Sequence, residues 1–105
     1  MNKLSIIVLS GFILSACTWV ELTAEGEKVR VLSASEVKSC KKLGKAVVKV
    51  KHTIANVERN KEKMTKELEQ LARNTAVELK GDTVVPATDI KEGKQTFHVY
   101  RCVNP

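Results

Sequence analysis

Two segments of the chain, residues 27–33 and 44–52, alternate apolar and polar side chains with a period of two. This period is typical of a β-strand that buries one face and exposes the other. In the first segment, one face carries Val29, Val31 and Ser33. In the second, the apolar face carries Ala46, Val48 and Val50. The opposite face of the second segment, which we expect to be wet and basic, carries Val47 with Lys45, Lys49 and Lys51.

The period changes to that of an α-helix over residues 57–80. One stripe of apolar and small side chains recurs at helical spacing, while charged side chains cover the remaining surface. The stripe consists of Met64, Leu68, Leu71, Ala72, Thr75 and Leu79. Thr53 or Asn56 is the expected N-terminal cap of this helix, since either side chain can accept from a free backbone N–H. Gly81 is the expected residue just beyond its C-terminal end.

Two further strands are expected after the helix. Thr83–Val85 begins a strand that Pro86 ends or confines to an edge, and residues 91–94 form a hairpin-type turn. Residues 95–103 alternate again, with Phe97, Val99 and Arg101 on one face and Thr96, His98, Tyr100 and Cys102 on the other. The element order predicts an α+β fold, in which one long helix packs on a small antiparallel four-stranded sheet. A single domain is expected over residues 27–105.

The N-terminal segment has the organisation of an export signal. A lysine near the start precedes an apolar stretch at residues 4–13, which has the length of a signal-peptide core and is too short to span a bilayer. The following Leu14-Ser15-Ala16-Cys17 resembles the lipobox at which bacterial lipoprotein precursors are acylated and cleaved. We therefore expect a signal peptide at residues 1–16, lipid on Cys17 and a lead-in at residues 17–26.

The residue after the lipidated cysteine bears on the final location. Thr18 stands where an aspartate usually retains a lipoprotein in the inner membrane, so we expect the outer membrane, with the domain facing the periplasm. Several acyl chains on Cys17 would make this anchor stable, because one chain alone binds a bilayer only marginally.

Lipid on Cys17 leaves Cys40 and Cys102, and two thiols in an oxidising compartment are expected to form a disulfide. An alternative is a zinc site built from both cysteines with His52 and His98, although no two of these ligands have the close spacing of typical zinc motifs. A redox-active pair would need a C-x-x-C motif, which the chain lacks.

Composition and charge narrow the classes of function. The chain has 18 basic and 12 acidic side chains, a net charge of +6, and only 4% aromatic residues. Its lysines are interleaved with glutamates and no aromatic platform is present, so nucleic acid is not an expected partner. The sequence contains no phosphate-binding glycine loop, nucleophile elbow or paired acids, so we predict no catalytic residue, no cofactor, no metal and no enzyme. Lys45, Lys49 and Lys51 form a candidate interaction face, unless they only solvate the surface.

Several motifs together resemble a known family of small proteobacterial lipoproteins, the DUF4156 type, whose function is unknown. They are the lipobox, Cys40-x-x-Leu43-Gly44, the run Gly81-Asp82-Thr83-Val84-Val85 after the helix, and the terminal Phe97-x-Val99-Tyr100-Arg101-Cys102. The helix followed by Gly-Asp-Thr-Val-Val is more distantly similar to the outer-membrane stress-sensor lipoprotein RcsF, which has two disulfides and a long tether.

These observations predict an outer-membrane-anchored periplasmic lipoprotein that acts as a non-enzymatic envelope binding or stress-sensing module. Its expected partners are the membrane, through the lipid, and an envelope protein. The alternative is a lipoprotein that binds a small ligand or metal ion on the sheet face around His98 and Tyr100. The sequence leaves the oligomeric state open.

Overall fold

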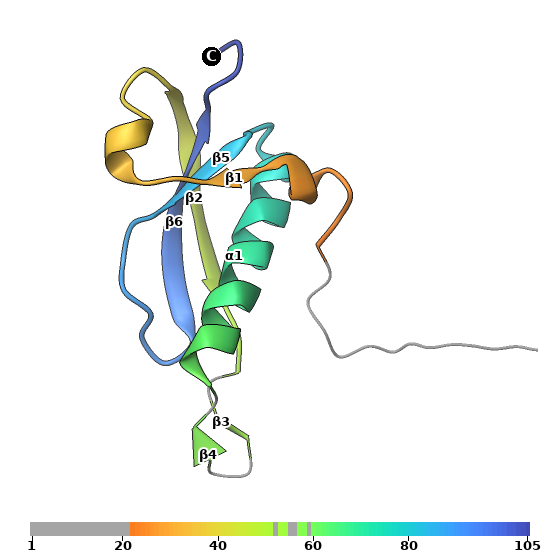
Figure 1. The fold of residues 1–105 in the computed structure, drawn as a ribbon, viewed down its shortest axis with the longest axis vertical. Coiled ribbons are helices and arrows are strands. Elements are labelled where there is room, and N and C mark those ends of the chain that lie inside the picture. The colour runs from red at the N-terminus through yellow and green to blue at the C-terminus, as the bar shows by residue number, and fades with distance from the viewer. Residues whose placement is uncertain (1–21, 52, 55–56, 59) are drawn as a thin grey trace, which may run out of the picture.

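In the computed structural model, which describes residues 22–51, 53–54, 57–58 and 60–105, four strands form one sheet and the helix α1 packs on it (Figure 1). The strands of this sheet are β1 (Arg30–Val31), β2 (Lys41–Lys49), β5 (Thr83–Pro86) and β6 (Lys94–Arg101). The helix spans Lys61–Glu78, and a small two-stranded sheet of β3 (Thr53–Ile54) and β4 (Val57–Glu58) precedes it. The short 3-10 helices η1 (Gly26–Lys28) and η2 (Ala34–Glu36) flank β1. The predicted α+β class is confirmed.

The four-stranded sheet is mixed, with the strand order β1-β5-β6-β2. β6 pairs antiparallel with both β2 and β5, but β1 runs parallel to β5, with Arg30 opposite Thr83 and Val31 opposite Val84. The prediction of a wholly antiparallel sheet is therefore wrong for this pair. β1 and β2 follow each other in sequence but lie at opposite edges, so β1 meets its partner only after the chain has passed through β2 and α1.

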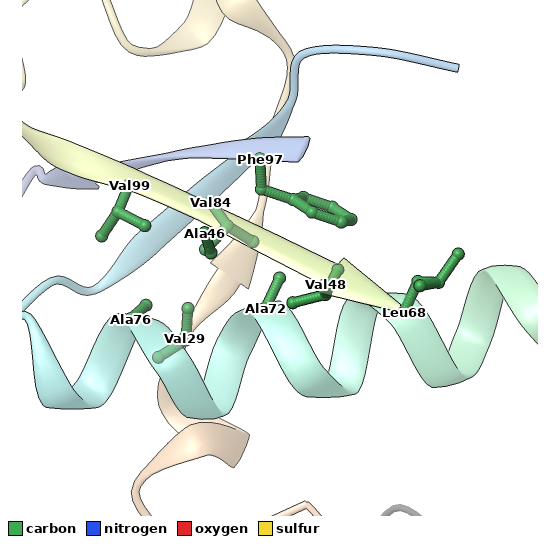
Figure 2. Packing of buried hydrophobic residues seen from close by; sticks show 9 residues of the cluster. All are labelled: Val29, Ala46, Val48, Leu68, Ala72, Ala76, Val84, Phe97 and Val99. Carbon is green, nitrogen blue, oxygen red and sulfur yellow. The ribbon is translucent and has the colours of Figure 1, made fainter. Parts of the chain in front are cut away.

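The core lies between α1 and the sheet (Figure 2). From the sheet it receives Ala46, Val48, Val84, Phe97 and Val99. Of the predicted helix stripe, Met64, Leu68 and Ala72 are buried, whereas Leu79 lies beyond the last helical residue and is 38% exposed. Ala76, which the prediction omitted, is fully buried in its place. Its small side chain and that of Ala72 let the helix backbone approach the strands closely.

Both ends of α1 differ from the prediction. Asn60 is the N-terminal cap, and its side chain accepts a hydrogen bond from the Lys63 N–H at 3.1 Å. The helix therefore starts later than predicted. Of the two predicted caps, Thr53 belongs to β3 and Asn56 lies outside the described residues. At the other end, Lys80 adopts the left-handed conformation expected for Gly81, with a φ of 64°.

A glycine is required at position 81 because β6 packs closely against it, and not because of a left-handed backbone conformation. Its N–H donates to the Ala76 carbonyl at 2.8 Å and closes the last turn of the helix. A Cβ at this position would lie 2.5 Å from Val99 Cγ1 and 2.9 Å from the Tyr100 carbonyl oxygen. The close approach of helix end and β6 thus explains the glycine.

The strand predictions are right in type and inexact in extent. β1 covers only two residues of the predicted 27–33, because η1 occupies its beginning and Ser33 is the N-terminal cap of η2, in a capping box with Glu36. β2 begins three residues earlier than predicted, and a register shift between Lys42 and Gly44 marks a β-bulge. The predicted turn at residues 91–94 is confirmed by reciprocal backbone hydrogen bonds of 2.9 Å between Lys91 and Lys94.

The segment before β1 is fastened to α1 by side chains of the helix. Asn74 Oδ1 accepts hydrogen bonds from the N–H and the hydroxyl of Thr23, at 3.0 and 3.1 Å. Arg73 donates to the carbonyl oxygens of Glu27 and Val29, at 2.8 and 2.9 Å. The lead-in predicted for residues 17–26 therefore contacts the domain from Thr23 onward. Within the described part of the chain, no helix has the length and apolar character needed to cross a membrane.

Candidate interaction face

The outer face of the β2–β6 pair, turned away from α1, gathers lysines from both strands. Since antiparallel partners point to the same side, the register places side chains on this face in four cross-strand pairs. These pairs are Lys42 with Tyr100, Lys45 with His98, Val47 with Thr96, and Lys49 with Lys94. We call this set of eight residues the basic face. Its four lysines are all exposed, whereas Thr96, His98 and Tyr100 are partly buried.

The positive charge of the basic face is not balanced within its own strands. Neither β2 nor β6 contains an aspartate or a glutamate. Lys49 and Lys94 lie directly opposite each other, and like charges in a cross-strand pair destabilise a sheet. An anion bound here would relieve this repulsion.

His98 reports the local electrostatics of this face. Burial lowers the pKa of its imidazole, and the positive charges of Lys42 and Lys45 lower it further. The ordinary pKa of a histidine is already below 7, and here it is lowered further. His98 is therefore neutral at pH 7. The lysines, rather than the histidine, supply the charge of the basic face under these conditions.

The structure brings together two of the three lysines predicted for an interaction face. Lys45 and Lys49 lie on the basic face, while Lys51 is exposed beyond the last residue of β2. Sequence reasoning missed Lys42 and Lys94. The bulge after Lys42 breaks the alternation that would have placed it, and only the register of β2 against β6 brings Lys94 beside Lys49.

The predicted disulfide is present. Cys40 and Cys102 are joined, with their Cα atoms 4.4 Å apart, and the bond links the segment that enters β2 to the end of β6. Of the alternative zinc ligands, both cysteines are thus in the disulfide, and His52 lies outside the described residues. The residues that the structure describes contain no group of three or more His, Cys, Asp or Glu that could hold a metal ion.

Asp82 holds the same end of β6 without a covalent bond. Its carboxylate accepts hydrogen bonds from the N–H groups of Cys102 and Val103, at 2.8 and 2.9 Å, and from the Thr83 hydroxyl at 3.0 Å. Partial burial opposes ionisation, but these hydrogen bonds and the charge of Arg30 outweigh it and lower the pKa of Asp82. Its role in these contacts is structural, because it holds the backbone just after β6.

Cys17, the predicted lipidation site, and the signal peptide at residues 1–16 lie outside the described residues. No curated protein and no solved structure matches this chain. One family model, described as a domain of unknown function (DUF4156), matches residues 20–102. That match covers most of the chain, including the basic face and both disulfide cysteines, and the protein therefore belongs to the DUF4156 family.

Proposed function

We propose that the protein is a lipoprotein of the outer membrane whose periplasmic domain binds an anionic envelope partner on the basic face, without catalysing a reaction. The observation that carries this proposal is the set of four exposed lysines on two paired strands that contain no acidic residue. Like charges held this close on a rigid sheet raise the local potential and favour an anionic ligand. The lipobox ending at Cys17 supports the anchor.

The tether limits where such a partner can be. Five residues lie between Cys17 and Thr23, a distance of six residue steps along the chain, and α1 holds Thr23 through Asn74. A fully extended chain gains at most about 3.6 Å per residue, so the anchor point can lie no more than about 22 Å from Thr23. The domain would therefore stay close to the membrane that holds its lipid.

The same contacts support one proposed orientation of the domain on the membrane. The tether enters the fold beside α1, whereas the basic face lies on the side of the sheet away from that helix. With the helix layer toward the bilayer, the basic face would point into the periplasm. This arrangement favours a soluble or neighbouring envelope partner over the lipids of the anchoring leaflet.

The anchor is tested by intact mass spectrometry of the protein extracted from its native membrane. An acylated chain that begins at Cys17 is the expected result. An unmodified N-terminus, or a chain that retains residues 1–16, would overturn the proposed anchor and with it the proposed orientation of the domain.

The binding face is tested with poly-glutamate as the anionic probe and the full chain in neutral detergent. We expect Lys45→Glu/Lys49→Glu to weaken binding at least tenfold. The matched control is Lys38→Glu/Lys66→Glu, which makes the same charge change at two exposed positions outside the basic face. The control should change affinity less than threefold. Equal losses in the two variants would mean that only net charge matters, and the proposed face would be wrong.

A further inference from the structure

Among the residues that the structure describes, no strand pairs with the outer edge of β2. β2 is an edge strand of the sheet in the residues that the structure describes. The Val50 N–H donates to the Gly93 carbonyl at 2.8 Å, which fixes the side of the ladder that faces β6. Backbone groups alternate between the two sides of a strand, so the N–H and C=O groups of Lys45, Val47 and Lys49 point away from β6. An extended chain could pair with them.

The side chains along this edge set the chemistry of such a chain. Val47 is 55% exposed between Lys45 and Lys49, while Ala46 and Val48 point the other way and are buried over α1 (Figure 2). A strand added beside β2 would place alternate side chains next to these three outer residues. Acidic side chains would neutralise the two lysines, and an apolar one between them would cover Val47.

The same edge rejects a second copy of this chain. In an antiparallel pair of two β2 edges centred on Val47, Lys45 of each copy would face Lys49 of the other. Both cross-strand pairs would then join like charges, which destabilise the pairing. Lysines on an exposed edge are a common protection against self-association. Here Lys45 and Lys49 repel a strand with basic side chains and attract one with acidic side chains.

We propose that the edge of β2 receives an extended acidic segment of a partner protein, which adds a strand to the sheet. The segment carries the pattern acid-x-apolar-x-acid, with its acidic side chains beside Lys45 and Lys49 and its apolar one beside Val47. This inference rests on the proposed function, because it names the partner class for the basic face. It adds that binding uses backbone hydrogen bonds as well as charge.

The probe is a synthetic peptide, Thr-Glu-Val-Val-Val-Glu-Thr, titrated into the full chain in neutral detergent. Hydrogen exchange of the backbone amides is read by NMR. We expect the amides of Lys45, Val47 and Lys49 to exchange at least tenfold more slowly when the peptide is bound. Exchange at these three positions that is unchanged by a saturating peptide would overturn strand addition.

Two matched changes separate hydrogen bonding from charge. A peptide of the same sequence, N-methylated at the two glutamates and the central valine, keeps its charge and loses the donors that face β2 in an antiparallel pairing. It should bind at least tenfold more weakly. On the protein, Val47→Pro removes one backbone donor from the outer edge of β2, at a position where a sheet tolerates proline. This variant should bind the peptide more weakly. The control Val47→Thr keeps the donor and should change the affinity less than threefold.

The outcomes distinguish this inference from the proposed function. If the N-methylated and unmodified peptides bind equally and both need Lys45 and Lys49, the basic face binds anions through charge alone, and strand addition is wrong. If neither the peptides nor poly-glutamate respond to Lys45→Glu/Lys49→Glu, the proposed function fails as well. Strand addition is supported if binding is weakened by N-methylation of the peptide and by Val47→Pro but not by Val47→Thr.

Discussion

Removing the disulfide should cost this domain much of its stability. The bond between Cys40 and Cys102 spans a sequence separation of 62, and the chain-entropy model gives about 4 kcal/mol for a loop of that size. A domain of about 100 residues is stable by only about 5–15 kcal/mol. In Cys40→Ala/Cys102→Ala, Asp82 still holds the Cys102 and Val103 N–H groups, so β6 should keep its place while the unfolded chain gains freedom.

Urea denaturation followed by circular dichroism measures this loss, with thermal unfolding beside it. The double variant should lose about 3–4 kcal/mol. For a domain of this size each kcal/mol lowers Tm by about 4–8 °C, so the expected fall is roughly 12–32 °C. Reductant should destabilise the wild type and leave the double variant unchanged, which serves as the control. A loss below about 1 kcal/mol would refute the argument that loop entropy dominates.

Three further predictions concern single side chains. Gly81→Ala should cost about 1–3 kcal/mol in urea denaturation, because the added methyl overlaps Val99 and the Tyr100 carbonyl; a neutral result would mean that α1 and β6 can move apart. The pKa of Asp82 is lower in the folded protein than in the unfolded chain, where it is near 4. The stability that the ionised Asp82 contributes is therefore complete above about pH 4 and is lost as the pH falls below that value. Asp82→Asn should therefore be less stable than the wild type at pH 7 and should lose less stability between about pH 4 and pH 2; parallel pH profiles of the two proteins would contradict this. Lys45→Ala should raise the pKa of His98 toward its ordinary value, since one of the charges that lower it is gone, and an NMR titration of the imidazole that shows no change would count against the assigned pairing.

Sequence periodicity located the faces of the long strands well. The alternation in β2 separated buried Ala46 and Val48 from exposed Lys45 and Lys49, because a two-residue period follows directly from strand geometry. It could not reveal the neighbour of β1. Two residues carry almost no pattern, and their parallel partner β5 lies some fifty positions further along the chain.

The end of the helix shows a second limit. The stripe that identified α1 included Leu79 and omitted Ala76, whereas the fold buries Ala76 and leaves Leu79 38% exposed. A small residue is chosen where two backbones approach, and that distance is a property of the tertiary structure. The lysines of the candidate site divide in the same way. Alternation predicted Lys45 and Lys49, but Lys42 and Lys94 join them only through a bulge and a cross-strand register.

The fastening of the N-terminal segment to α1 has a mechanical consequence. If the chain carries the proposed lipid anchor and that anchor is pulled, the load enters the described domain near Thr23 and meets the hydrogen bonds of Asn74 and Arg73 before it reaches any strand. The first element to yield would be η1, at the start of the domain, while β2 and β6 stay joined through the Cys40–Cys102 bond. Tension on the membrane side would therefore spare the basic face, and a bound partner could be held while the envelope moves.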